Sequence, residues 1–305
     1  MYYETNRSKI KTIIRNIIIK IFGKKSHSLL KFKRDFQNLL KNVINKFFLS
    51  IDFISDKNKK KKKNIDLINK LNFNKEKIES ILSKHEKKFF DEHLKWHHHL
   101  LANFSSDDQL KILEIGTYKG ETTKFLANIF PNSKITTIDL PDKKFMEINQ
   151  SDSFKVPLGA QLLSDNLNSI DFTNLKELAN IFIETRKKNL EKDNINFIQI
   201  DSFQAIEIFQ KNSFDFIWVD GNHIMPQVAF DIFQAFHLCK KNGYILCDDI
   251  VMKVHQRATS SNEGYKIIDE LTKNNYIKTN YFYQTIEPKK IIELDNFISL
   301  SKKLI

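Results

Sequence analysis

One short segment holds two of the seven glycines in this 305-residue chain and limits the folds that the sequence can adopt. It reads Lys111-Ile-Leu-Glu-Ile-Gly-Thr-Tyr-Lys-Gly120, and residues 122–130 continue with the apolar spacing of a helix. Average usage would give about 7% glycine, roughly three times as much, so we expect the backbone to require the glycines of this segment. A strand, a glycine turn and a helix N-terminus form the ligand cradle of a doubly wound α/β sheet, because the helix start offers free N–H groups.

The second predicted strand narrows the choice of cofactor. Residues 134–139 end in Asp139, about 20 residues beyond the glycines, where doubly wound folds hold ribose hydroxyls. The turn reads Glu-x-Gly-x-x-x-Gly and lacks the middle glycine that lets a pyrophosphate approach the backbone. This spacing disfavours a nicotinamide cofactor, and Glu114 before the turn suits a ligand with an ammonium group. The alternative is an ordinary tight turn in another α/β protein.

The loop resembles motif one of the class I S-adenosylmethionine-dependent methyltransferases, and most closely the metal-dependent O-methyltransferases of the macrocin and catechol types. In those families it reads Glu-(Leu/Ile)-Gly-(Ala/Thr)-Tyr-x-Gly, which residues 114–120 match. The resemblance covers roughly residues 90–305. It implies S-adenosylmethionine as the cofactor, held by the loop and by the carboxylate that ends the second strand: Glu114, Gly116, Thr117, Tyr118, Gly120 and Asp139.

A third predicted strand, residues 195–200, ends at Asp201 and Ser202. In the resembling families an acidic residue at this point receives the adenine amino group, so we place both residues in the cofactor site. Either residue suits the N-cap of a following helix equally well. The two roles can coexist, with Asp201 at the adenine and Ser202 as the cap.

Two further strand patterns end in carboxylates. Residues 214–219 stop at Asp220, and residues 243–247 stop at Asp248 and Asp249. Because the carboxyl ends of neighbouring parallel strands face one crevice, we expect the three carboxylates to lie beside the cofactor loop. Carboxylates about 4 Å apart repel by several kcal/mol at an effective dielectric near 20, and a hard cation such as Mg²⁺ relieves that repulsion.

The same O-methyltransferases have a matching metal site. The resemblance implies that Asp220, Asp248 and Asp249 are metal ligands, and that His223, three residues after the first ligand, is the macrocin-type base. The macrocin motif reads Asp-Gly-Asp-His, and Asn222 here replaces its second aspartate, which removes a charge near the histidine. Taken alone, His223 could also be a hydrogen-bonded loop residue and the aspartate pair a helix cap.

The predicted function is Mg²⁺-dependent methylation of a hydroxyl group on a small acceptor, for example a sugar or saccharide precursor. Methyl transfer from a sulfonium is an in-line displacement, so positioning supplies much of the acceleration. Mg²⁺ lowers the pKa of the hydroxyl, and an imidazole can take its proton near neutral pH. Two alternatives stay open: a metal-dependent hydroxylase-like enzyme on the same fold, and a membrane- or partner-associated module that only retains the cofactor fold.

The predicted fold is a Rossmann-like, doubly wound seven-stranded α/β sheet. Residues 276–284 and 296–301 read as the antiparallel hairpin that closes a methyltransferase sheet. We expect a methyltransferase domain over residues 74–305 and a basic helical extension with a lysine-rich linker over residues 1–73. Residues 141–172 show little periodicity, and we expect a substrate-facing lid there.

The net charge of +12 belongs to the N-terminal part of the chain. Residues 1–100 hold 25 Lys and Arg against 10 Asp and Glu, whereas residues 101–305 hold 24 against 27. Isoleucines at helical spacing between basic residues predict an amphipathic helix within residues 7–25, which can lie on an anionic membrane surface or pack within a homo-oligomer or the same protein. Residues 57–63, almost all lysine, predict a solvated linker; nucleic acid is disfavoured as a partner because aromatic residues do not interleave it.

The remaining features bear on environment and on other sites. Two cysteines and no run of 18 apolar residues predict a cytoplasmic protein, peripheral to the inner membrane surface if the basic helix binds lipid. The histidine-rich helix contains His93 and residues 97–99, but three consecutive side chains cannot converge on one ion. We expect these histidines to lie on the surface or at a pocket edge. His255 and Arg257, just after the acidic pair, could reach the acceptor.

Overall fold

The computed structural model describes residues 58–73, 75–83, 95–104, 109–142, 175–223, 225–252, 262–284 and 296–305. The chain divides into two compact units, residues 1–59 and 60–305, and the sheet with its helices belongs to the second. Several predictions fall outside the described residues. These are the basic amphipathic helix at 7–25, most of the lid at 141–172, and the side chains of His93, His255 and Arg257.

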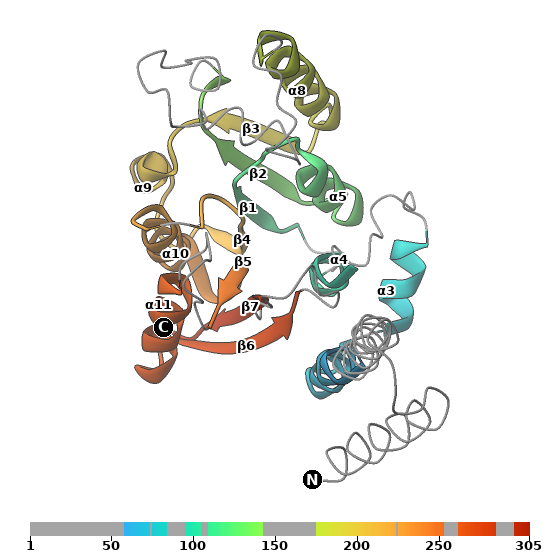
Figure 1. Ribbon diagram of the computed structural model, residues 1–305, viewed down its shortest axis with the longest axis vertical. Coiled ribbons are helices and arrows are strands. Elements are labelled where there is room, and N and C mark those ends of the chain that lie inside the picture. The colour runs from blue at the N-terminus through green and yellow to red at the C-terminus, as the bar shows by residue number, and fades with distance from the viewer. Residues whose placement is uncertain are drawn as a thin grey trace, which may run out of the picture. The chain divides into compact units, whose positions relative to one another are not determined.

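Seven strands form one mixed sheet in the order β3-β2-β1-β4-β5-β7-β6 (Figure 1). The first five pair in parallel, whereas β7 runs antiparallel to both β5 and β6. This arrangement confirms the predicted seven-stranded fold with its antiparallel C-terminal hairpin. The bounds of the strands are β1 Lys111–Ile115, β2 Lys134–Asp139, β3 Ile195–Gln199, β4 Phe214–Val219, β5 Cys239–Val251, β6 Ile277–Tyr283 and β7 Asn296–Lys303.

Helices cover both faces of the sheet. One face packs against α4 and α5, and the other against α9, α10 and α11 (Figure 1). Within the ranges given above, no helix is both long and apolar enough to cross a membrane. The bounds of the helices are α3 Lys75–Leu82, α4 Lys95–Ala102, α5 Glu121–Ile129, α8 Leu175–Asn189, η4 Ser202–Gln204 (a 3₁₀ turn), α9 Ala205–Ile208, α10 Gln227–Leu238 and α11 Glu263–Lys273.

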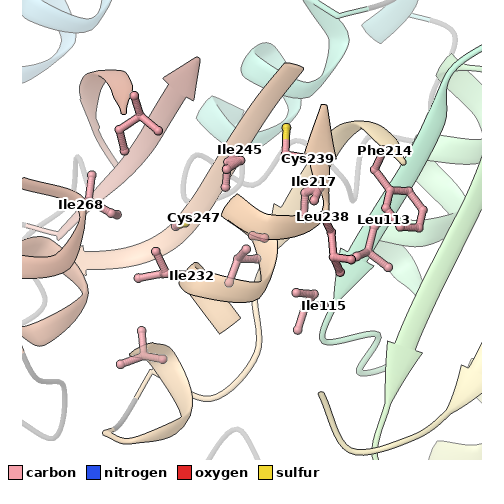
Figure 2. Packing of buried hydrophobic residues seen from close by; sticks show 14 of the residues in the cluster. Leu113, Ile115, Phe214, Ile217, Ile232, Leu238, Cys239, Ile245, Cys247 and Ile268 are labelled. Carbon is pink, nitrogen blue, oxygen red and sulfur yellow. The ribbon is translucent and has the colours of Figure 1, made fainter. Parts of the chain in front are cut away.

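Strand β4 shows how the sequence builds this double-sided core. Phe216 and Trp218 point toward α4 and α5, while Ile217 and Val219 point toward α10. All four are buried, so the strand reads as a continuous apolar run, as strands covered on both faces do. Figure 2 shows the α10 side, where Leu113, Ile217 and Ile245 of three strands meet helix residues such as Ile232.

The two cysteines lie in this same core. Cys239 and Cys247 are free and buried, and burial raises the pKa of each thiol to about 12. A thiol with so high a pKa is protonated at neutral pH and is a poor nucleophile. Both cysteines therefore act as small apolar core residues (Figure 2).

The lysine-rich segment differs from its predicted form. The structure places residues 58–70 in a helix, so the linker predicted at 57–63 is wrong for residues 58–63. Residues that follow the lysines explain the difference, because Ile68 is buried in the core on the α4 and α5 side of the sheet. Buried Asn64 donates to the Tyr283 carbonyl and accepts from the Tyr283 N–H, both at 2.8 Å, which fastens the helix to the end of β6. The Lys60 and Lys63 ammonium groups lie over the Tyr283 ring.

Candidate functional site

The loop after β1 has the backbone that its glycines predict. Gly116 and Gly120 have φ values of +100° and +74°, in the left-handed region that favours glycine. The Gly116 N–H donates to the Ile138 carbonyl at 3.0 Å, and the Gly120 N–H donates to the Thr117 carbonyl at 2.8 Å. Gly120 lies immediately before α5, so the loop leads directly into the helix N-terminus. The predicted strand–turn–helix cradle is present.

Gly116 also brings this loop against the end of β4. A Cβ atom built on Gly116 would lie 2.1 Å from the Asp220 carbonyl oxygen and 2.9 Å from the Gly221 Cα. The Asp220 N–H donates to the Ile115 carbonyl at 2.8 Å, which keeps the two backbones together. Only glycine permits this approach, and it places the cofactor loop beside the first residue of the acidic cluster.

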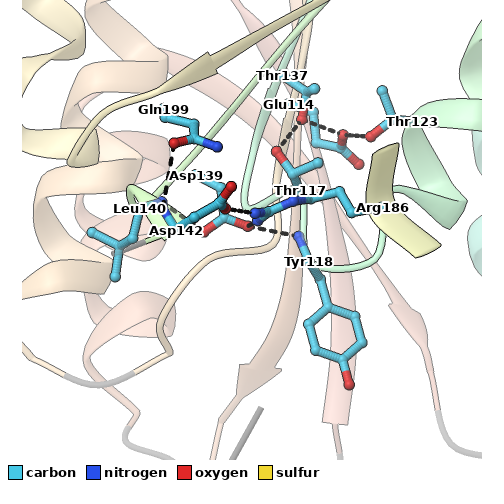
Figure 3. Close-up of polar contacts among 10 residues, drawn as sticks. All are labelled: Glu114, Thr117, Tyr118, Thr123, Thr137, Asp139, Leu140, Asp142, Arg186 and Gln199. Carbon is cyan, nitrogen blue, oxygen red and sulfur yellow. Dashed lines mark hydrogen bonds and ion pairs between the residues drawn. The ribbon is translucent and has the colours of Figure 1, made fainter. Parts of the chain in front are cut away.

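Glu114 lies beneath the loop in a network of threonine hydroxyls (Figure 3). Its Oε2 atom accepts hydrogen bonds from Thr137, at 2.6 Å, and from Thr123. Because the single Thr137 proton goes to Glu114, Thr117 is the donor in its 2.6 Å contact with Thr137. The Glu114 side chain is fully buried. The structure therefore gives Glu114 a role in holding the loop, and its contact with the cofactor stays a prediction.

Asp139 stands at the end of β2, as the sequence predicts, and braces the same loop. Its Oδ2 atom accepts from the Tyr118 N–H at 2.7 Å, and its Oδ1 atom accepts from the Leu140 N–H at 2.8 Å (Figure 3). The first bond stabilises Tyr118 in a left-handed conformation, with φ of +48°. Burial raises the pKa of Asp139, while these hydrogen bonds and the Arg186 guanidinium oppose the rise.

The N-cap at the start of η4 is Asp201, whereas we expected Ser202. The Asp201 side chain accepts from the Phe203 N–H at 3.2 Å. Ser202 instead donates to buried Asp231 at 2.6 Å, and Gln227 donates to the same carboxylate at 3.0 Å. A carboxylate can bond two N–H groups, so the cap does not exclude an adenine contact.

Sequence reasoning missed Asp231. It lies on α10 beneath the loop that follows β4: a Cβ atom on Gly221 would be 2.8 Å from its Oδ2 atom. Burial raises the pKa of Asp231 to about 6, although Ser202 and Gln227 oppose the rise by hydrogen bonding. Asp231 thus lies between two loops: it accepts a hydrogen bond from Ser202 and packs against Gly221, the residue after Asp220. A single carboxylate inside an otherwise apolar helix pattern gave no signal of such a partner.

The predicted acidic residues come together just after β4 and within β5, which continues to Val251 and does not stop at Asp248 as predicted. His223 Nε2 lies 3.8 Å from Asp220 Oδ1 and 3.6 Å from Asp249 Oδ2. Consecutive residues of a regular strand point to opposite faces, yet Asp248 and Asp249 both reach the cluster. The pairing register of β5 with β7 shifts between residues 247 and 250, and Asp249 has a φ of +49°. This irregularity turns the second carboxylate toward the first, as β-bulges near active sites do.

The carboxyl groups of the cluster differ in their affinity for protons. Burial and the charges of Asp248 and Asp249 raise the pKa of Asp220 well above its usual value. Burial alone would also raise the pKa of Asp248, but His97 outweighs it and the net shift is downward. Asp220 is therefore the residue that keeps a proton most readily and can donate it to Asp248. Within the described residues, no three His, Cys, Asp or Glu side chains are grouped so that they could hold a metal ion.

His97 is a site residue that sequence reasoning missed. Its Nε2 atom lies 2.8 Å from Asp248 Oδ1, and its ring meets the Trp218 ring edge-on with centroids 5.5 Å apart. Gln284, at the end of β6, lies 3.5 Å from the same nitrogen and hydrogen-bonds to Asp249. Of the two positions predicted for these histidines, the surface is wrong for His97 and His98, because both are buried, His98 against the Phe125 ring. Their helix packs on the sheet, so one histidine lies at the edge of the acidic cluster.

Residues 113–250 match a family model described as a methyltransferase domain. The match begins within β1 and ends just after Asp249, so it covers the cofactor loop and the acidic cluster together. The chain contains a methyltransferase domain. Its sheet has the closing antiparallel hairpin that the resemblance predicted.

The methyltransferase is also similar to several solved structures. An O-methyltransferase from Bacillus cereus in complex with S-adenosylhomocysteine is 18% identical, with a TM-score of 0.44, and 79% of this chain and 96% of that chain are covered. TomG from Streptomyces achromogenes, in complex with S-adenosylmethionine, is 14% identical, with a TM-score of 0.43 and coverage of 67% and 78%. An rRNA methylase from Streptococcus thermophilus is 12% identical, with a TM-score of 0.42 and coverage of 71% and 99%. No curated protein matches at a significant level.

The close approach at Gly116 predicts that alanine lowers the free energy of unfolding by different amounts at the two loop glycines. Gly116→Ala should lower the free energy of unfolding by at least ~3 kcal/mol, because the left-handed backbone alone costs about 1–2 kcal/mol and the Asp220 backbone must also move. Gly120→Ala should cost only about 1–2 kcal/mol. The atom that its Cβ would meet, at 2.9 Å, belongs to the flexible Leu190 side chain. Urea unfolding of both variants checks this, and equal stabilities would contradict it.

Glu114 predicts a pH dependence of the methyltransferase's stability. Burial raises its pKa from 4.5 to about 7, so the folded state binds the proton more tightly than the unfolded state. Stability is therefore lost as the pH rises from about 4.5 to about 7, by about 3 kcal/mol in total. Glu114→Gln should remove this part of the slope, as measured by urea unfolding at pH 4.5, 6 and 8. Exposed Glu177→Gln is the control; a Glu114→Gln profile parallel to it would show that Glu114 does not titrate this way.

Proposed function

We propose that this methyltransferase transfers the methyl group of S-adenosylmethionine to a hydroxyl oxygen of a small acceptor, such as a sugar or saccharide precursor. One observation carries the proposal: the Gly116 backbone lies against the backbone of Asp220. The loop that would hold the methyl donor therefore lies next to the loop that carries Asp220 and His223, and the two would line one site. A donor site next to a proton acceptor is what O-methylation requires.

The donor half of the site uses backbone groups more than side chains. Residues 116–120 and the N-terminus of α5 present N–H groups and the positive end of the helix dipole, which suit the carboxylate of the methionine part. Asp139 is partly exposed at the end of β2 and would accept a ribose hydroxyl. Asp201 and Ser202 end the next strand in the sheet and would face the adenine.

His223 is the base in this proposal. Its imidazole is partly exposed and lies between the carboxylates of Asp220 and Asp249, which orient it and stabilise the cation that it becomes. The acceptor oxygen attacks the methyl carbon as the carbon–sulfur bond breaks and S-adenosylhomocysteine leaves. The hydroxyl proton passes to His223 Nε2, so the ether product is neutral. Proton transfer to a positioned base contributes typically 10²–10⁴-fold to such a rate.

Mg²⁺ is the proposed metal, and the ligand types of the cluster fit it. Asp220, Asp248 and Asp249 supply the carboxylate oxygens that Mg²⁺ prefers. Burial and the charges of Asp248 and Asp249 raise the pKa of Asp220, and a cation would relieve the repulsion among the three. These three residues would hold the ion after their side chains draw together, since the described residues contain no group of three already arranged to do so. When bound, the ion lowers the pKa of an acceptor hydroxyl and orients it.

Isothermal titration of the full chain with S-adenosylhomocysteine tests the cofactor assignment. Affinity in the micromolar to submillimolar range is expected, and no binding at millimolar concentration would reject the proposed function. Methyl transfer from labelled S-adenosylmethionine to a panel of saccharides and catechols then tests the acceptor class. Activity lost in EDTA and restored by Mg²⁺ is expected; activity unchanged in EDTA would remove the metal and leave the methyl transfer.

The role of His223 predicts a separation of binding from turnover. His223→Asn should lower kcat by about 10²–10⁴-fold, because the proton then has no base, while the affinity for S-adenosylhomocysteine stays within about twofold. His237→Asn, at an exposed position in the last turn of α10, is the control and should leave both unchanged. If His223→Asn keeps more than half of the wild-type kcat, another group is the base.

A further inference from the structure

Arg186 is a buried cation that has no role in the proposed methyl transfer. It lies on α8 with 1% of its surface exposed and is among the largest fully buried side chains of the described residues. The guanidinium carbon lies 5.1 Å from the centre of the Phe182 ring and 4.9 Å from that of Phe197. Burying a cation is costly unless it is paired, so its partners should explain its presence.

Those partners are the two carboxylates at the end of β2. Nη2 of Arg186 forms a close ion pair with Asp142 Oδ1, and Nη1 lies 3.8 Å from Asp139 Oδ2 (Figure 3). The two aromatic rings contact the guanidinium, and the ion pair with Asp142 holds its Nη2 end. Arg186 therefore presents one constant positive charge to the carboxylate that braces the glycine loop.

The hydrogen bonds of Asp139 leave room for a ligand. An ionised carboxylate has about four acceptor positions. The Tyr118 N–H binds Oδ2, the Leu140 N–H binds Oδ1, and the Thr117 N–H also hydrogen-bonds to the carboxylate, while 15% of the side chain is exposed. Three of the four acceptor positions are then in use, and the remaining one can accept a hydroxyl, provided that the carboxylate stays ionised. Burial raises the pKa of Asp139 and so opposes its ionisation. The Tyr118 and Leu140 N–H groups, and after them the positive charge of Arg186, favour the ionised form.

We propose that Arg186 is a positioning residue for the cofactor: it keeps Asp139 oriented and able to accept a hydrogen bond from a ribose hydroxyl. This inference rests on the proposed function, because it requires an adenosine cofactor at the β2 end. It makes α8, which is far along the chain from the glycine loop, part of the cofactor site. A helix that only packed on the sheet would not affect how the protein distinguishes one ribose from another.

Ribose discrimination is therefore the measurement that tests the proposal. Titration calorimetry of the full chain compares S-adenosylhomocysteine with its 2′-deoxy and 3′-deoxy analogues. The wild-type protein should prefer the full ribose by about 10–100-fold over the analogue that lacks the bonded hydroxyl, the range for a hydrogen bond to a charged group. Arg186→Met keeps the length and apolar stem of the side chain but removes the charge, and should reduce the preference to less than about threefold. Asp139→Asn should do the same.

Further variants keep the test informative. Arg186→Lys retains the charge and should recover part of the preference. Arg186→Gln, which also removes the charge, takes the place of Arg186→Met if that variant does not fold. Lys187→Met changes an exposed neighbour on α8 and should behave as wild type. Thermal unfolding of each variant shows that the bound fraction is folded.

The possible failures differ from one another. If Arg186→Met weakens all three ligands equally and keeps the wild-type preference, Arg186 is only structural and the inference is overturned. If wild-type protein binds S-adenosylhomocysteine but shows no ribose preference, the inference is overturned while the proposed function stands. If wild-type protein binds none of the three ligands, the proposed function fails with it.

Discussion

The contact between the Gly116 and Asp220 backbones is the constraint on which the rest of the site depends. It needs a residue without a Cβ atom at the end of β1 and a chain that turns away immediately after β4. Parallel pairing of the two strands brings their carboxyl ends together, and the missing side chain lets the following loops touch. In the proposed function a methyl donor and a proton acceptor have to be within a few ångströms of each other, and this contact would supply that proximity.

Around this contact, the carboxylates of the site each have a different kind of partner. Glu114 has threonine hydroxyls, Asp139 has backbone N–H groups and a nearby guanidinium, and Asp248 has an imidazole. Hydroxyls alone leave Glu114 with a pKa of about 7, whereas His97 lowers the pKa of Asp248. Partner chemistry thus decides which carboxylates stay charged, and charge decides which of them can bind a cation or a hydroxyl.

The sequence predicts those parts of the structure that are set by neighbouring residues. Strand β2 has the predicted bounds, and β4 ends at Asp220 as expected, because an apolar run followed by a polar turn needs no distant partner. His97 and Arg186 could not be assigned in this way. Each contacts a carboxylate that is distant in the sequence: 151 residues away for His97, and 44 and 47 residues away for Arg186. Neither a periodicity nor a motif marks such a pair. The turn of Asp249 toward the site also depends on the register of β5 with β7, which the sequence of one strand does not contain.

The helix at residues 58–70 changes where the folded unit has to begin. Asn64 completes the hydrogen bonding of Tyr283 at the open end of β6, and Gln284, the next residue, lies against His97 and Asp249. A protein trimmed to the matched family region, or to the start of α3, would leave both backbone groups of Tyr283 without that side chain. The end of β6, which is an edge strand of the sheet, would then lose these hydrogen bonds and fray. The surroundings of the acidic cluster therefore depend on residues that lie N-terminal to the matched family region.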